Sequence, residues 1–115
     1  MKTKLILLAA AIASVAACSK DLGKVHERRA ALVARVFPAE ADRTGISLAF
    51  PVESHLEIIY FPDEVSHAAI QSRAAAYCKR IGHPTLKVAR PLKDTQTTLA
   101  DGTVRASKGI LYDCD

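Results

Sequence analysis

The side chains with the most evident chemistry in this sequence are three cysteines, Cys18, Cys78 and Cys114. A thiolate acts as a nucleophile or a metal ligand, and two thiols can join in a disulfide, so each role depends on compartment and neighbours. The four histidines are scattered, and none has an acidic or nucleophilic partner at a spacing typical of catalysis. The sequence also contains no glycine-rich phosphate loop, no G-x-S-x-G motif and no two histidines four residues apart. These patterns do not indicate an enzyme or a cofactor.

Cys18 follows a segment that predicts export. A head with two lysines precedes an apolar run over residues 5–13, and small residues follow before the cysteine. A membrane-spanning helix needs about 20 apolar residues, and charged residues from Lys20 onward interrupt the run too early. Residues 1–17 therefore predict a signal peptide that is removed from the mature chain.

The stretch Val15-Ala16-Ala17-Cys18 resembles the lipobox of bacterial lipoprotein precursors. In that family the cysteine thiol receives a diacylglyceryl group, a peptidase then cuts just before the cysteine, and the new amine is often acylated. Thioether formation needs a soft nucleophile, which a thiol provides. The resemblance implies that Cys18 is lipidated and attaches the chain to a lipid bilayer. The alternative is an ordinary secretory signal with a coincidental cysteine, which would also export the chain.

The residue after the cysteine carries a sorting cue in lipoproteins of two-membrane bacteria, where aspartate tends to retain the protein in the inner membrane. This chain has Ser19 at that position. The resemblance therefore implies transport to the outer membrane, with the folded part facing the periplasm. Each buried methylene contributes about 0.8 kcal/mol, so two or three acyl chains would give firm attachment.

Residues 18–44 predict a lipid-anchored tether with a short helix over Val25–Val36, which should end before Pro38. Arg29 interrupts the apolar stripe of this helix, so the helix is marginal unless it lies on the domain or on the membrane. A spacer that buries too little to order itself is the favoured interpretation.

The positive charge of the chain is concentrated in this tether. Without the signal peptide, fourteen basic residues face twelve acidic ones, and residues 45–115 hold eight of each sign. Attraction to acidic lipid headgroups and simple solvation of the tether are two explanations for the basic excess. A nucleic-acid partner would need a basic face and stacking aromatics, and the neutral domain without tryptophan offers neither.

Residues 45–115 predict one small α+β domain. The runs ISLAF and HLEIIYF indicate two antiparallel strands, and the second run, apolar on both faces, indicates a central strand. Further strands are expected in TLKVAR, limited by Pro91, in a hairpin of TQTTL and TVRAS joined by Asp101-Gly102, and in GILYDC.

The main helix of this domain is expected between Pro62 and Pro84. Asp63 would cap its first turn, Glu64 would complement the positive end of its dipole, and Gly82 would end it. This interpretation explains the two acids better than a catalytic pair does. The expected fold is a small antiparallel sheet of four or five strands with this helix packed on one face, in the order ββαβββ.

The periodicity of the main helix and of the last strand turns Cys78 and Cys114 toward the core. In an oxidising periplasm, with Cys18 bonded to lipid, this pair predicts a disulfide between helix and sheet. Two free buried thiols are the alternative. A metal site from Cys78, His83 and Cys114 would have neither a fourth ligand nor the usual paired spacing, so no metal is expected.

These observations favour a membrane-anchored lipoprotein without catalytic activity, whose domain binds an envelope protein or a cell-wall component or strengthens the envelope. A second hypothesis is a periplasmic inhibitor or immunity-type protein that presents an exposed loop such as RPLKDTQTT to an enzyme. A small hydrolase is the third, and it would need a pocket of several hundred Å³.

Overall fold

The computed structural model describes residues 22–115, so the predicted signal peptide and Cys18 lie outside the described residues. An N-terminal helix is described over residues 22–36. The elements that follow are a 3-10 helix η1 (Glu40–Arg43), strands β1 (Ile46–Val52) and β2 (His55–Tyr60), helix α2 (His67–Arg80), and strands β3 (Leu86–Thr98) and β4 (Val104–Cys114).

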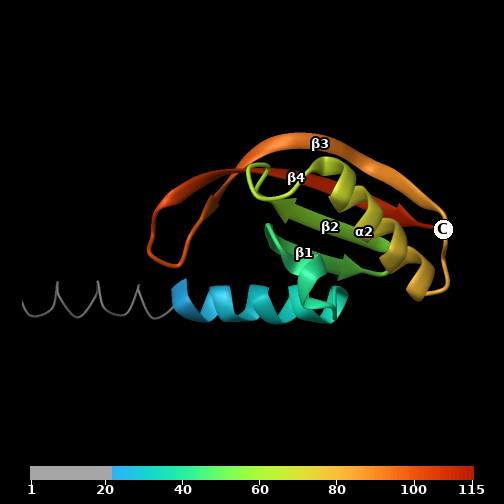
Figure 1. Cartoon of the computed structure of the whole chain (residues 1–115), viewed down its shortest axis with the longest axis horizontal. Coiled ribbons are helices and arrows are strands. Elements are labelled where there is room, and N and C mark those ends of the chain that lie inside the picture. Colours follow the sequence, from blue (N-terminus) through green and yellow to red (C-terminus); the bar gives the residue numbers. More distant parts are fainter. Residues whose placement is uncertain (1–21) are drawn as a thin grey trace, which may run out of the picture.

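The strands form one antiparallel sheet in the order β1-β2-β4-β3, and α2 lies across one face of it (Figure 1). The predicted α+β fold, an antiparallel sheet with one main helix on one face, is confirmed. Residues His55–Tyr60 of the run HLEIIYF form β2, which is central as predicted, with β1 on one side and β4 on the other. Leu56, Ile58 and Tyr60 are buried against the core, and the alternate residues on the other face are half-buried.

The prediction that Pro91 limits a strand is wrong. Pro91 lies inside β3, and the expected third and fourth segments merge into one 13-residue strand that pairs with the 11-residue β4. Because β3 is an edge strand, the missing N–H of the proline need not leave a ladder bond unmade. The register shifts between Val88 and Arg90 and between Arg90 and Lys93, which accommodates the irregular backbone.

The prediction that Asp63 caps the main helix is also wrong. The cap is Ser66, whose side chain accepts a 3.1 Å hydrogen bond from the backbone N–H of Ala69. The preceding residues form a separate turn that buries Val65, and Asp63 points to Arg105 of β4 instead. The helix ends as expected, since Gly82 takes the left-handed conformation with φ +85°.

The core lies between α2 and the sheet, and it includes residues from the N-terminal helix. Ile70, Ala74 and Cys78 of α2 are fully buried. Val33, Val36 and Phe37 belong to the same buried cluster. Arg80 of α2 also donates a hydrogen bond to the carbonyl oxygen of Val36 at 2.7 Å. The other members of the cluster are Ala49, Leu56, Ile58, Tyr60, Val65, Ile70, Ala74, Ile110 and Tyr112.

The boundary expected at residue 45 therefore does not coincide with the edge of the core. The N-terminal helix lies beside β1 in Figure 1, and its residues Leu32 and Val36 line a surface pocket together with Phe50 and Pro51. The predicted helix exists, and it is ordered by packing onto the domain rather than by its own propensity. No helix within residues 22–115 is long and apolar enough to span a membrane.

Candidate functional site

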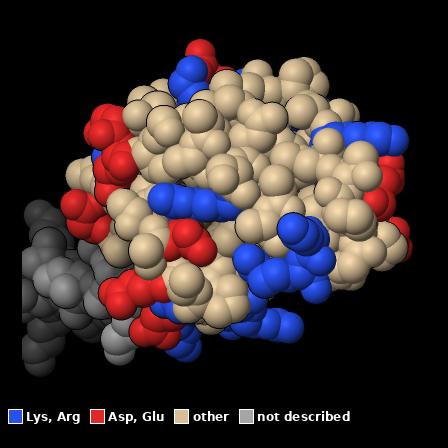
Figure 2. All heavy atoms as spheres, turned by 45° about the vertical axis from the view of Figure 1, so that its right-hand side comes forward, with Lys and Arg blue, Asp and Glu red and all other residues tan. Residues whose placement is uncertain are grey.

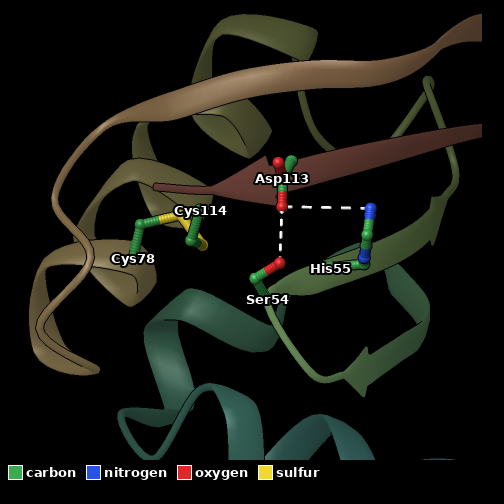
Figure 3. The surroundings of a disulfide bond; sticks show 5 residues. All are labelled: Ser54, His55, Cys78, Asp113 and Cys114. Atoms are coloured by element: carbon green, nitrogen blue, oxygen red, sulfur yellow. Dashed lines mark hydrogen bonds and ion pairs between the residues drawn. A yellow bond between two sulfur atoms is a disulfide. The ribbon is translucent and has the colours of Figure 1, made fainter.

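Cys78 of α2 and Cys114 of β4 are joined by a disulfide, with their Cα atoms 5.2 Å apart (Figure 3). Both residues are buried, with exposed fractions of 0% and 1%. Cys78 falls on the inward stripe of α2, and the alternation of β4 turns Cys114 to the same layer. The bond leaves neither cysteine as a thiolate, so these two residues cannot ligate a metal together with His83.

Ser54, His55 and Asp113 meet beside the disulfide, where the β1–β2 turn reaches the end of β4 (Figure 3). The Ser54 hydroxyl donates to Asp113 Oδ1 at 2.7 Å, and His55 Nε2 lies 3.9 Å from the same oxygen. In a serine hydrolase the imidazole must contact the serine oxygen in order to take its proton. Here the carboxylate occupies that position, so the cluster fastens the turn to β4 and does not generate a nucleophile.

His26 and Ser47 both line a surface depression of about 350 Å³ between the N-terminal helix and the sheet. Its ring nitrogens are each 2.9 Å from a backbone carbonyl oxygen, Nδ1 from Leu22 and Nε2 from Thr98. Both nitrogens face backbone carbonyl oxygens and neither contacts the Ser47 hydroxyl, so His26 is not positioned to take a proton from Ser47. His26 instead ties the β3–β4 hairpin to the helix.

Two buried tyrosines offer no base at neutral pH. Burial raises the pKa of Tyr60, whose hydroxyl lies 2.9 Å from Nδ1 of His67. Burial, followed by the repulsion from Tyr60, raises the pKa of Tyr112 to about 12. The Tyr112 hydroxyl has no hydrogen-bond partner among residues 22–115. Both phenols therefore stay protonated.

The described part of the chain also contains no cluster of three His, Cys, Asp or Glu side chains suited to a metal ion.

The concave feature of interest is a groove of about 120 Å³ on the sheet face opposite α2, which we call the open-face groove. Its floor is apolar and its rim carries both signs of charge; the lining residues are Glu57, Ile59, Arg90, Pro91, Lys93, Thr95, Gly109, Ile110 and Leu111. No ion pair within residues 22–115 involves Glu57, Arg90 or Lys93. The rim charges are therefore available to a partner.

Two local features produce the groove. Gly109 has no side chain, so the floor is low where Ile59 and Thr95 face each other across it; a Cβ atom there would lie 3.8 Å from each. The two register shifts in β3 displace the segment around Pro91 from regular pairing. A small residue and a bulged edge thus create a hollow in a sheet that would otherwise be filled by side chains.

Part of the remaining charge is paired and stabilises the fold. Arg105 contacts Asp63 at 2.8 Å and Glu64 at 2.7 Å, and its guanidinium lies 4.1 Å from the centre of the Phe61 ring. The hydrogen bond from Arg105 lowers the pKa of Asp63. On the face in Figure 2, uncharged residues occupy most of the surface, and Lys and Arg do not merge into one continuous patch. That face does not resemble a nucleic-acid-binding surface.

Sequence reasoning found the two cysteines and missed the groove and the Ser54–Asp113 contact. The groove residues come from β2, β3 and β4, and Ser54 and Asp113 are 59 positions apart. Among the groove residues, Gly109 offered a sequence signal, because an isolated glycine in a strand marks a bulge or a close approach. Comparison with protein families, curated proteins and solved structures finds no match for this chain.

Proposed function

We propose that this protein is a lipoprotein of the bacterial cell envelope, anchored through acylated Cys18, whose domain binds a partner without catalysis. The outer membrane, with the domain facing the periplasm, is the proposed location because Ser19 follows the cysteine. The partner would be an envelope protein or a component of the cell wall. The Cys78–Cys114 disulfide supports export, since such bonds persist in oxidising compartments.

The observation that carries the binding role is the open-face groove. It combines a small apolar floor with rim charges that no described residue neutralises, an arrangement typical of sites that hold a ligand group by contact and orient it by charge. Its volume of about 120 Å³ is below the roughly 300–1,000 Å³ of pockets that enclose a whole small molecule. A single side chain or terminal group of a larger partner fits this size better than a complete substrate.

The other two hypotheses have weaker support. The inhibitor hypothesis requires RPLKDTQTT to form an exposed loop, and residues 90–98 lie within β3 instead. A hydrolase needs a nucleophile in contact with a base, and Ser54 donates to Asp113 while Ser47 has no free imidazole beside it. Non-catalytic binding is the function that agrees best with this geometry.

Anchoring is tested by replacing Cys18 with serine and fractionating the cells. The parent should be found in membranes, and Cys18→Ser should be lost from them. A variant that remains as membrane-bound as the parent would contradict the lipoprotein assignment.

Binding at the groove is tested with two defined probes, purified peptidoglycan sacculi in co-sedimentation and envelope extracts in mild detergent. The double variant Arg90→Glu, Lys93→Glu reverses the cationic rim, and Arg73→Glu with Lys79→Glu, on α2, is a control with the same charge change away from the groove. We expect the parent and the control to bind the same partner in one of these assays, and we expect the rim variant to lose that binding. If the three proteins retain the same material, or none retains any, the groove is not a binding site.

A further inference from the structure

Three cations lie along one exposed stripe of the N-terminal helix. Lys24 and Arg28 are four positions apart, and Arg35 follows Arg28 by seven, so the three side chains stack on one face of the helix. All three are exposed, whereas Val33 and Val36 are buried against the domain. We call Lys24, Arg28 and Arg35 the cationic stripe.

No described residue neutralises the stripe. None of its three members forms an ion pair within residues 22–115. Over residues 22–36 the helix carries four basic side chains, the fourth being the half-buried Arg29, and one acid, Glu27. By contrast, Arg105, Lys87 and Lys108 of the sheet each contact a carboxylate. The unpaired positive charge of the helix therefore faces outward.

We propose that the cationic stripe rests on the surface of a bilayer that contains acidic phospholipids. This inference rests on the proposed anchoring for its biological setting. Lys24 follows Cys18 by six positions, and a chain of that length spans at most about 20 Å even when fully extended. An acylated Cys18 would thus hold the start of the helix near the headgroups, where each basic residue gains electrostatic attraction.

A lipid surface fits the stripe better than a protein partner does. A specific protein interface usually buries apolar anchors at its centre. The stripe offers three extended cations, with Ala31 between them and Val25 beside them, 42% exposed. A flat layer of acidic headgroups requires only that the cationic side chains extend to the same plane, and side chains on one face of a helix do so.

Docking through this helix would also orient the domain. The N-terminal helix lies beside β1, and β3 reaches the helix only with its last residues, at Thr98, while its first part lies at the opposite edge of the sheet (Figure 1). With the stripe on the bilayer, most of β3 and the rim residues Arg90 and Lys93 would face away from the membrane. The acylated Cys18 would then fix the distance of the domain from the bilayer, and the helix would fix the orientation of the domain. The open-face groove would remain accessible to partners.

The test uses the processed chain, residues 18–115, with Cys18→Ser, so that no acyl chain contributes. Sedimentation with vesicles of phosphatidylglycerol and phosphatidylcholine, and with vesicles of phosphatidylcholine alone, measures partitioning in low salt and in 1 M salt. The stripe variant is Lys24→Gln, Arg28→Gln, Arg35→Gln. The control, Lys79→Gln, Lys87→Gln, Lys108→Gln, removes three charges from α2 and the sheet, outside both the cationic stripe and the lining of the open-face groove. Equal thermal midpoints for the stripe variant and the parent verify that the substituted helix remains packed.

We expect binding to the acidic vesicles only, abolished by 1 M salt, with a loss on the order of 100-fold in the stripe variant and little change in the control. Equal binding to both vesicle types, equal losses in the two variants, or no binding by the parent would overturn the docking proposal. These outcomes leave the anchor untouched, because the assay contains no lipidated protein. Conversely, a failed fractionation test of Cys18 would leave the vesicle result standing.

Discussion

The Cys78–Cys114 disulfide ties the last turn of α2 to the end of β4, where fraying of the chain would otherwise begin. It closes a loop of sequence separation 36, for which the chain-entropy model gives about 4 kcal/mol. We therefore expect Cys114→Ser to lower the free energy of unfolding by about that amount in a urea titration. A reducing agent should destabilise the parent similarly and leave the variant almost unchanged. Coincident unfolding curves for parent and variant would show that the bond does not stabilise the domain.

Tyr112 makes the stability of the domain sensitive to alkali. Burial raises its folded pKa to about 12, above the value near 10 expected in the unfolded chain. The unfolded state therefore loses the proton first, so this stabilisation is complete below about pH 10 and is lost as the pH rises toward 12. Thermal midpoints measured from pH 9 to 12 should fall, and they should fall less steeply in Tyr112→Phe. Parallel slopes in the two proteins would argue against this assignment.

Tyr112→Phe also tests what the buried hydroxyl of Tyr112 contributes to stability at neutral pH. The Tyr112 hydroxyl has no hydrogen-bond partner within residues 22–115 although the residue is 0% exposed. Replacing it with hydrogen removes a desolvated polar atom and keeps the ring, so at pH 7 we expect Tyr112→Phe to be neutral or stabilising by about 1 kcal/mol. Tyr60→Phe is the matched control, since it breaks the contact with His67 and should be destabilising.

At the scale of elements, the start of α2 depends on Ser66. Removing an N-cap oxygen costs about 1 kcal/mol, so Ser66→Ala should lower the free energy of unfolding by that amount. Asp63, the cap that the sequence suggested, is exposed and joined to Arg105, so Asp63→Ala should have a smaller effect that high salt diminishes. The opposite order of the two losses in urea unfolding would assign the cap to Asp63.

The β3–β4 hairpin depends on its contact with the N-terminal helix. His26 Nε2 lies 2.9 Å from the carbonyl oxygen of Thr98, next to the turn that links the two strands. One net hydrogen bond contributes about 1 kcal/mol, so His26→Ala should raise amide exchange about fivefold in the turn, at Leu99 and Gly102. His83→Ala, which keeps this contact, serves as the control. Unchanged exchange in His26→Ala would mean that the hairpin is held by its own strands.

For the whole molecule, the N-terminal helix is part of the fold. Val33, Val36 and Phe37 are 1–5% exposed, and burying each such side chain contributes roughly 1.5–3 kcal/mol. A chain that begins at Gly45 should therefore lose on the order of 5 kcal/mol, which is comparable with the total stability of a small domain. We expect it to bind hydrophobic dyes and to unfold without cooperativity, whereas residues 18–115 with Cys18→Ser should unfold cooperatively. A cooperative transition of equal midpoint in the shorter chain would restore the tether interpretation.

The sequence by itself determined what depends on local pattern. Apolar residues on both faces of the run HLEIIYF indicated that β2 is central. Helical periodicity identified α2 as the main helix, and the periods of α2 and of the last strand identified Cys78 and Cys114 as inward-facing, because burial on one face imposes these periods. The residues of these elements that face the core were thus largely predictable. The predictions for the signal peptide and Cys18 are of the same local kind, and they lie outside the described residues.

Tertiary structure decided what depends on register and on neighbours. Ser54 meets Asp113 because β2 and β4 pair in one particular register, and Glu57 shares a groove with Arg90 because β4 pairs with β2 on one side and with β3 on the other. Ser66 replaces Asp63 as the cap because the turn before α2 buries Val65 and brings Asp63 to Arg105. The N-terminal helix, marginal alone, gains order from a core that residues far along the chain supply. Such contacts join residues tens of positions apart. The sequence around either residue alone therefore does not indicate that the contact forms or how much it stabilises the fold.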